Sequence, residues 1–197
     1  MDFTFNYTKY LDKNPLQKLL LNNFFDTLFK MIDDLSVNRI LDVGCGEGVM
    51  LEKFSKQNIG EYLEGVDNSK DALRLAKILY PNIAFKKGNI YNLSYKDNSF
   101  DFVACIEVLE HLERPIDAIQ EIMRVTGRYV IFSIPNEPIF RIANFLRGRY
   151  IKDFGNTPGH INHWSRNSFS DLLQSQGVKI ISIKTPFPWT IILGRKE

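Results

Sequence analysis

The sequence has few cysteines, no long apolar run and almost no excess of charge, and each shortage excludes a class of protein. Its two cysteines, Cys45 and Cys105, both lie within apolar runs, so a disulfide scaffold is not indicated. No stretch approaches the roughly 18 consecutive apolar residues of a membrane helix. Residues 1–9 lack the basic and apolar regions of a secretory signal. We therefore expect a cytoplasmic protein with no membrane partner.

The formal net charge of +2 favours no particular partner, because dedicated nucleic-acid binders carry a stronger basic excess or a basic stripe. One local enrichment stands out, at Arg141, Arg147, Arg149 and Lys152. Such a cluster is commonly a solvated face. It is also consistent with a landing site for an anionic substrate, and the sequence leaves both interpretations open.

A chain of 197 residues, 44% of them hydrophobic, fits a single domain that spans residues 1–197. Asn14-Pro15 is a helix-start signal, because a capping residue precedes a proline at the first helical position. Helically spaced apolar residues continue from Leu16 to Leu35. We therefore expect residues 1–36 to form a helical cover over the core.

From residue 39 onward, short apolar runs alternate with helical patterns. Near-continuous apolar strands that alternate with helices indicate a parallel sheet covered on both faces. The ligand crevice of such a doubly wound sheet lies at the carboxyl ends of its strands. The predicted strands are 39–43, 62–66, 83–87, 100–106 and 129–134, and the predicted helices are 48–57, 70–79 and 115–125.

Residues 135–164 break this pattern. Their prolines and glycines predict an irregular segment, and a long irregular segment inside a compact domain is usually functional. We expect a substrate lid, with apolar walls from Phe140, Phe145, Tyr150 and Phe154. A predicted helix at 165–176 follows, and then strands at 178–184 and 189–193. The short link between these strands predicts an antiparallel hairpin, which brings the sheet to seven strands.

The stretch Leu41–Gly48 carries the strongest functional signal. It reads Leu-Asp-Val-Gly-Cys-Gly-Glu-Gly, so three glycines follow a strand and precede a helix. Glycines permit positive φ and let a ligand lie against the main chain. The dinucleotide fingerprint G-x-G-x-x-G would require glycine where Val49 stands, and no phosphate-binding lysine follows. These departures argue against a dehydrogenase and against a P-loop.

A carboxylate ends the second predicted strand. Asp67 lies about twenty residues past the glycines, where an acid can accept hydrogen bonds from both ribose hydroxyls of an adenosyl group. The same residue before Asn68-Ser69 also fits a helix cap. Its register with the glycine loop favours ribose binding.

On these residues, Leu41–Arg195 resembles the class I S-adenosylmethionine-dependent methyltransferases of the small type 11 kind, over nearly the whole chain. The resemblance implies an α/β fold: a doubly wound, mostly parallel seven-stranded sheet with an antiparallel C-terminal hairpin. It implies that the glycine loop meets the methionine part of S-adenosylmethionine and that Asp67 binds the ribose. Where the family often has Asp near the adenine amine, this chain has Asn89, whose carbonyl can still accept. The candidate cofactor-binding residues are Asp42, Gly44, Cys45, Gly46, Asp67, Asn68, Asn89, Ile90 and Ile106.

A second candidate site follows the fourth predicted strand. If Glu107-Val-Leu-Glu110-His111 forms a helical turn, its two carboxylates and imidazole project from one face and could hold a divalent ion. They could equally be solvated, with His111 pairing locally. Together with His160, which stands four residues ahead of Trp164-Ser165-Arg166, the segment resembles small-RNA 3′-terminal ribose 2′-O-methyltransferases. Ubiquinone-pathway catechol O-methyltransferases are also similar around Glu107–His111. The resemblance implies a Mg²⁺ or Mn²⁺ site at Glu107, Glu110, His111 and His160, with His160 preferred to His163.

The reaction implied is methyl transfer to a small hydroxylated molecule. Because an alcohol or phenol must lose its proton, a metal at this site or His111 as general base would assist the reaction. A nucleic-acid methyltransferase remains an alternative, supported only by the basic residues of the lid. A third alternative is a module that binds the cofactor and transfers nothing.

Overall fold

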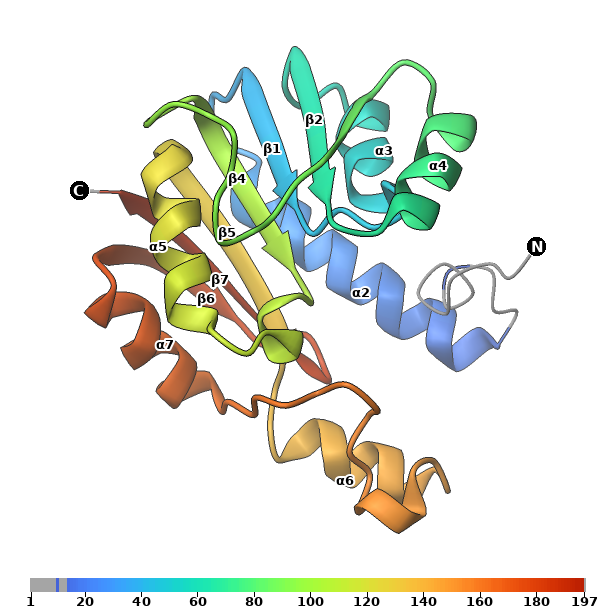
Figure 1. Cartoon of the computed structure of the whole chain (residues 1–197). Helices are drawn as coiled ribbons and strands as arrows, with labels where there is room; N and C mark the ends of the chain where they lie inside the picture. Colours follow the sequence, from blue (N-terminus) through green and yellow to red (C-terminus); the bar gives the residue numbers. More distant parts are fainter. Residues whose placement is uncertain (1–9, 11–13, 197) are drawn as a thin grey trace.

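The computed structural model describes residue 10 and residues 14–196, and its centre is a seven-stranded sheet (Figure 1). The strand order is β3-β2-β1-β4-β5-β7-β6. β1 to β5 pair in parallel, whereas β7 runs antiparallel to both β5 and β6. The predicted fold is therefore confirmed. The strands are β1 Arg39–Val43, β2 Tyr62–Asp67, β3 Ala84–Lys87, β4 Phe100–Ile106, β5 Thr126–Pro135, β6 Val178–Lys184 and β7 Trp189–Lys196.

Helices cover both faces of the sheet (Figure 1). α5 and α7 contribute to one hydrophobic core, and α2, α3 and α4 contribute to the other. The helices are α2 Pro15–Ile32, α3 Val49–Lys56, α4 Lys70–Leu79, α5 Pro115–Val125, α6 Ile139–Leu146 and α7 Arg166–Ser175, with short 3₁₀ turns η1 at Leu109–His111 and η2 at Ile151–Asp153.

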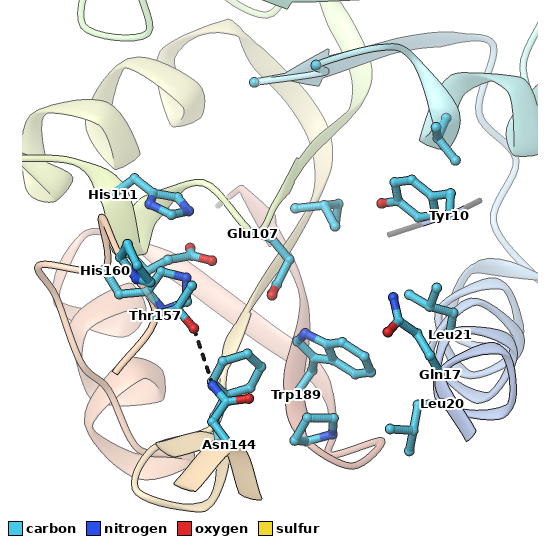
Figure 2. A pocket seen from close by; sticks show the side chains of 18 of the residues that line it. Tyr10, Gln17, Leu20, Leu21, Glu107, His111, Asn144, Thr157, His160 and Trp189 are labelled. Carbon is cyan, nitrogen blue, oxygen red and sulfur yellow. Dashed lines mark hydrogen bonds between the residues drawn. The ribbon is translucent and has the colours of Figure 1, made fainter. Parts of the chain in front are cut away.

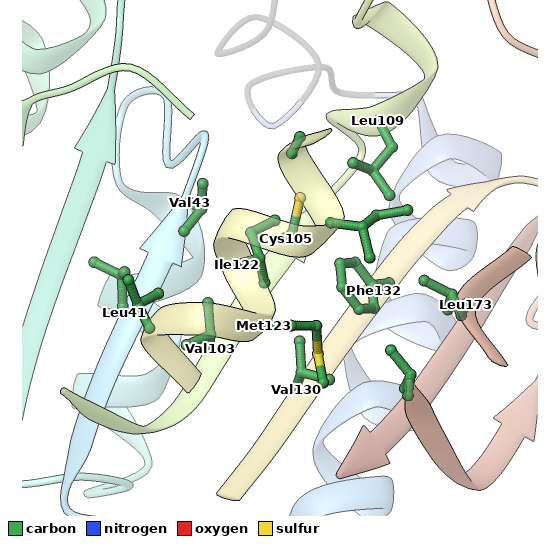
Figure 3. Packing of buried hydrophobic residues seen from close by; sticks show 14 of the residues in the cluster. Leu41, Val43, Val103, Cys105, Leu109, Ile122, Met123, Val130, Phe132 and Leu173 are labelled. Atoms are coloured by element: carbon green, nitrogen blue, oxygen red, sulfur yellow. The ribbon is translucent and has the colours of Figure 1, made fainter. Parts of the chain in front are cut away.

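The two cores arise from the alternation of side chains along each central strand. On β4, Val103 and Cys105 face α5 and α7, as Figure 3 shows, whereas Phe102 and Ala104 belong to the opposite core. All four side chains are fully buried. A strand that is buried on both faces needs apolar residues at every position, which explains the continuous apolar runs in the sequence.

The predicted N-terminal helix is α2. Asn14 caps it by accepting a hydrogen bond from the Leu16 amide at 2.9 Å, and Pro15 is its first residue. The buried residues of α2 lie in its second half and pack in the core shared with α3. Among the described residues, no helix is long and apolar enough to cross a membrane.

The expectation of an irregular segment at 135–164 is wrong in part, because α6 lies within it. The prolines stand outside the helix: Pro135 ends β5, and Pro138 is the residue before the first helical turn. Proline is tolerated there because the first turn of a helix has no internal partner for its N–H groups. Between Ile139 and Leu146 no proline or glycine interrupts the helix.

Candidate active site

A cavity of about 820 Å³ opens at the carboxyl ends of β1 and β4. Figure 2 shows that its walls come from segments far apart in the sequence. They include the glycine loop after β1, the segment after β4, the lid, the start of α2 and the link before β7. The residues that line the cavity include Tyr10, Gln17, Leu20, Leu21, Asp42, Gly44, Cys45, Gly46, Ile106, Glu107, Glu110, His111, Phe140, Asn144, Arg147, Arg149, Tyr150, His160 and Trp189.

The glycine loop adopts a backbone that only glycine forms without strain. Gly44, Gly46 and Gly48 have φ of +77°, +51° and +83°. A Cβ on Gly44 would lie 2.5 Å from Cγ2 of Val108, whereas a Cβ on Gly46 would meet no atom within 4 Å. Gly44 is therefore required for packing as well as for backbone conformation. Gly46 leaves open space beside the main chain, where a ligand can approach.

Asp67 braces this loop from the end of β2. Its Oδ2 accepts a hydrogen bond from the Gly46 amide at 2.8 Å, and its Oδ1 accepts one from the Ser69 amide at 2.8 Å. Each carboxylate oxygen can accept a further hydrogen bond, so the bracing leaves capacity for a ligand hydroxyl.

The structure brings part of the predicted cofactor set into the cavity. Asp42, Gly44, Cys45, Gly46 and Ile106 line it, whereas Asp67, Asn68, Asn89 and Ile90 lie outside its lining. Oδ1 of Asn89 accepts a hydrogen bond from the Tyr91 amide at 3.1 Å.

Asp42 is a buried acid at the end of β1. Burial, and secondarily the charge of Asp67, raises the pKa of the Asp42 carboxyl from 3.8 to about 7. Burial also raises the pKa of the Cys45 and Cys105 thiols, and neither cysteine forms a disulfide. Burial therefore favours the neutral forms of Asp42 and Cys45, the two of these groups that line the cavity.

Glu110, His111 and His160 form a compact polar cluster on the opposite side of the cavity. One ligand atom from each lies within 4.8 Å of the others, and the two imidazole rings meet edge to face at 4.8 Å between centroids. Nδ1 of His111 lies 2.9 Å from the Gly159 carbonyl oxygen. Because a carbonyl oxygen only accepts, Nδ1 carries the proton, and in the neutral ring Nε2 keeps its lone pair.

Main-chain hydrogen bonds hold the two segments of this cluster together. The Ile161 and Asn162 amides donate to the Glu110 carbonyl oxygen at 2.9 and 3.1 Å. Nδ2 of Asn162 donates to the Leu112 carbonyl oxygen at 2.6 Å. His160 therefore reaches Glu110 and His111 through a paired loop, although some fifty residues separate them in the sequence.

The expected helical turn at Glu107 is wrong. Glu107 has φ of +57°, and the 3₁₀ turn begins only at Leu109. The Glu107 amide donates to the Ser133 carbonyl oxygen at 3.1 Å, and Oε1 of Glu107 accepts from the Ser133 hydroxyl at 2.9 Å. Because of this pairing with β5, Glu107 does not share a helical face with Glu110 and His111. Glu107 lines the cavity but lies outside the cluster found among the described residues.

The segment 135–164, predicted as a lid, contributes to the cavity through one face of α6 and the loop after it. Phe140 and Tyr150 line the cavity, and the Phe140 ring stacks on His160 at 5.8 Å. Nδ2 of Asn144 donates to the Gly155 carbonyl oxygen at 3.1 Å, which fastens the loop to α6. Two predicted wall residues, Phe145 and Phe154, do not line the cavity and are exposed.

Two of the four basic residues in this segment, Arg147 and Arg149, line the cavity, whereas Arg141 and Lys152 do not. His163 is exposed, with its Nε2 2.8 Å from Oδ1 of Asn156. It lies outside the Glu110–His111–His160 cluster.

Sequence reasoning missed the contribution of the two ends of the chain. Tyr10 and the first turns of α2 line the cavity, with Gln17, Leu20 and Leu21, as does Trp189 at the start of β7 (Figure 2). The apolar spacing of α2 indicates a buried face but does not tell a core from a cavity wall. No signal in the sequence pairs Trp189 with the site.

Comparison with known protein families identifies the family of the chain. A sequence profile described as a methyltransferase domain matches residues 11–183. The chain belongs to the methyltransferase-domain family. Its cofactor is S-adenosylmethionine, as the glycine loop predicts. The residues present fit that group, because the main chain at Gly46 is open toward the cavity and the Asp67 carboxylate is hydrogen-bonded to the Gly46 amide.

The chain spans only part of the length of the related methyltransferases that it matches. The ubiquinone biosynthesis O-methyltransferase of Alkalilimnicola ehrlichii is 29% identical over 185 residues, which cover 85% of this chain and 71% of that protein. An uncharacterized methyltransferase of Schizosaccharomyces pombe is 42% identical over 106 residues, covering 47% of this chain and 38% of that protein. The mitochondrial ubiquinone biosynthesis O-methyltransferase of the same yeast is 28% identical over 139 residues, 66% of this chain and 50% of that protein.

Solved methyltransferase structures share the fold at low sequence identity. The magnesium protoporphyrin IX methyltransferase of Synechocystis, with bound S-adenosylhomocysteine, superimposes with a TM-score of 0.72 at 17% identity, covering 98% of this chain and 95% of that one. An S-adenosylmethionine-dependent methyltransferase of Mesorhizobium loti gives a TM-score of 0.69 at 15% identity, covering 88% and 98%.

Proposed function

We propose that this methyltransferase transfers a methyl group to a hydroxyl oxygen of a small molecule, and that the Glu110–His111–His160 cluster positions and deprotonates that hydroxyl. One observation carries the proposal: the cluster and the glycine loop line the same cavity. The ubiquinone biosynthesis O-methyltransferases among the relatives support the same reaction type.

An oxygen nucleophile must lose its proton during methyl transfer, whereas a neutral amine has a lone pair available from the start. The fixed proton on Nδ1 of His111 leaves Nε2 as the atom that can accept the hydroxyl proton. His111 is therefore the candidate catalytic base.

A divalent metal ion fits the same three residues. Two imidazole nitrogens and one carboxylate oxygen form a donor set that binds transition metals, so we favour Mn²⁺ over Mg²⁺, which prefers oxygen ligands alone. The hydrogen bond from His111 to the Gly159 carbonyl is the kind of support that orients a ligating imidazole. When bound, such an ion would occupy the Nε2 lone pair of His111 and would take the place of the imidazole base, because it would lower the pKa of a hydroxyl and orient neighbouring hydroxyl oxygens.

The walls of the cavity support a planar, negatively charged acceptor. Phe140 and Trp189 offer aromatic surfaces, and Arg147 and Arg149 place positive charge at the lid side. A guanidinium group binds carboxylate in a bidentate manner. We therefore propose a hydroxylated aromatic acid, with vicinal hydroxyls, as the substrate class.

Calorimetry with Mn²⁺, Mg²⁺ and S-adenosylhomocysteine tests the site. We expect Glu110→Ala and His160→Ala to lose Mn²⁺ binding, while the exposed neighbours Glu113→Ala and His163→Ala keep it. Asp67→Ala should lose S-adenosylhomocysteine because it removes both the loop brace and the ribose acceptor.

The reaction itself is tested by mass spectrometry with 3,4-dihydroxybenzoate and with monohydroxybenzoates as acceptors. We expect methylation of the dihydroxy compound, lowered by chelator and by His111→Ala. Cofactor binding without methylation of any hydroxybenzoate would refute the substrate class. Equal Mn²⁺ affinity in Glu110→Ala and Glu113→Ala would refute the metal site.

A further inference from the structure

Helix α6 carries two stripes of side chains on opposite sides, and the one away from the cavity is wholly apolar. Phe140, Ala143 and Asn144 follow i, i+3, i+4 spacing and line the cavity. A second stripe at Ile142, Phe145 and Leu146, together with Phe154 beyond η2, faces away from it. We call this second surface the outer face of α6. A helix that only covered a cavity would need one apolar stripe, so the outer face requires its own explanation.

The outer face is a continuous apolar surface rather than a set of scattered side chains. Its residues line a shared apolar groove of about 310 Å³ with Pro138 and Arg141. Leu146 and Phe154 are 79% and 74% exposed, and the neighbouring Ile151 is 58% exposed. Isolated apolar residues are common on protein surfaces, but a contiguous patch marks an interaction site. Figure 1 shows α6 projecting from the body of the molecule beyond the end of β5.

The charges around the outer face indicate the partner. Residues 138–154 contain four basic residues and one acidic residue, Asp153. Arg141 lines the groove and Lys152 is exposed, whereas Arg147 and Arg149 line the cavity side and are also exposed. Apolar side chains within a basic rim are the pattern of segments that lie in the interface of anionic membranes. A second copy of the chain would bring the same positive charges into contact, which opposes self-association.

A second element on the cavity rim presents apolar side chains as well. Leu16 and Leu19 in the first turns of α2 are exposed, whereas their neighbours Gln17 and Leu20 line the cavity. α2 and α6 thus both border the cavity and both expose leucine or larger side chains beside it. A partner that binds both helices would therefore lie next to the opening of the cavity.

We propose that the outer face of α6 docks on the surface of an anionic lipid membrane, with Arg141 and Lys152 contacting lipid headgroups. Peripheral docking needs no membrane-spanning helix, and none is found in the part of the chain that the structure describes. The proposal does not depend on the reaction proposed above, since vesicle binding needs neither cofactor nor acceptor.

Flotation of the full chain with lipid vesicles tests the proposal. One set of vesicles is phosphatidylcholine alone, and in the other about a third of the lipid is anionic phosphatidylglycerol. We expect binding to the anionic vesicles that weakens as salt is raised. Leu146→Glu and Phe154→Glu should each weaken it about tenfold or more. Lys152→Glu should weaken it about fivefold or more.

Matched controls lie on α4, where Lys77 and Ile78 are both exposed. Lys77→Glu and Ile78→Glu should leave vesicle binding unchanged, and thermal melting should show every variant folded. Three results would overturn the proposal. The first is a wild-type chain that does not bind anionic vesicles, and the second is a loss of binding in the α4 controls as large as in the α6 variants. The third is a dimer in sedimentation velocity that Leu146→Glu abolishes, which would assign the outer face to a second copy.

Discussion

Replacing Asp42 by Asn should change how the stability of the protein depends on pH. Asp42 is buried at the end of β1, and burial together with the Asp67 charge raises the pKa of its carboxyl from 3.8 to about 7. Between these two values the folded chain holds a proton that the unfolded chain has lost. Folding stability therefore falls as pH rises through this range, because the folded state binds more protons. Asparagine has the shape of the acid and no charge to bury.

The magnitude follows from the two pKa values. Each pKa unit corresponds to 1.36 kcal/mol, so a pKa raised from 3.8 to about 7 corresponds to about 4 kcal/mol of stability lost above neutral pH. At pH values below about 4 the carboxyl is protonated in both states and this contribution vanishes. Asp42→Asn should accordingly match the wild type in acid and exceed it by up to about 4 kcal/mol near pH 8.

Urea unfolding followed by circular dichroism at a series of pH values measures this difference. The difference in unfolding free energy between Asp42→Asn and wild type should climb between about pH 4 and pH 7 and then level off. Asp33→Asn, at an exposed position after α2, serves as control and should show no such climb. A flat difference across that range would refute the reasoning, since it would mean that Asp42 ionises as readily as an exposed acid.

Four further substitutions test the scaffold by urea unfolding. Gly44→Ala should cost about 2–5 kcal/mol, from left-handed strain plus the clash with Val108, whereas Gly46→Ala should cost only the strain, about 1–2 kcal/mol; equal losses would contradict the packing role of Gly44. Glu64→Gln should cost about 1–3 kcal/mol at neutral pH, because the buried carboxylate accepts from Tyr95 at 2.7 Å and pairs with Lys86 at 2.7 Å. Burial alone would raise the pKa of Glu64, but these partners lower it, so the loss should shrink as pH falls through that pKa, and a loss that is independent of pH would count against the ionised form. Phe54→Ala, in a fully buried ring between α2 and β4, should cost about 3–5 kcal/mol, and a loss below about 1 kcal/mol would show that the core relaxes around the gap.

The sheet and the cofactor loop were predictable because local sequence determines them. Continuous apolar strands, the positive-φ glycines and the acid at the end of β2 are all contained in short windows, and each appears in the structure where the pattern placed it. The extent of β5 was underestimated because Thr126–Arg128, at its start, carry no apolar run. Thr126 pairs with Phe100 on β4, a contact that lies far away in the sequence.

The remainder of the site depends on contacts between distant residues. Glu107 leaves the helical geometry because Ser133, on another strand, fixes its backbone and its carboxylate. α6 was not predicted because prolines and glycines, which stop a helix, are frequent in residues 135–164. They lie on either side of α6 and not within it. The use of Tyr10 and Trp189 as cavity walls is set by how the ends of the chain fold back, which no local pattern encodes.

The position of Trp189 has a practical consequence. The chain has two tryptophans, and only Trp189 lines the cavity, where its ring packs on Phe24 at 5.2 Å. Trp164 packs instead on Phe169 in the core beside α7. Indole emission depends on local polarity and on nearby quenchers. In a Trp164→Phe background the emission of Trp189 would therefore follow the filling of the cavity directly, which gives the protein an intrinsic optical signal for titrating any compound that enters.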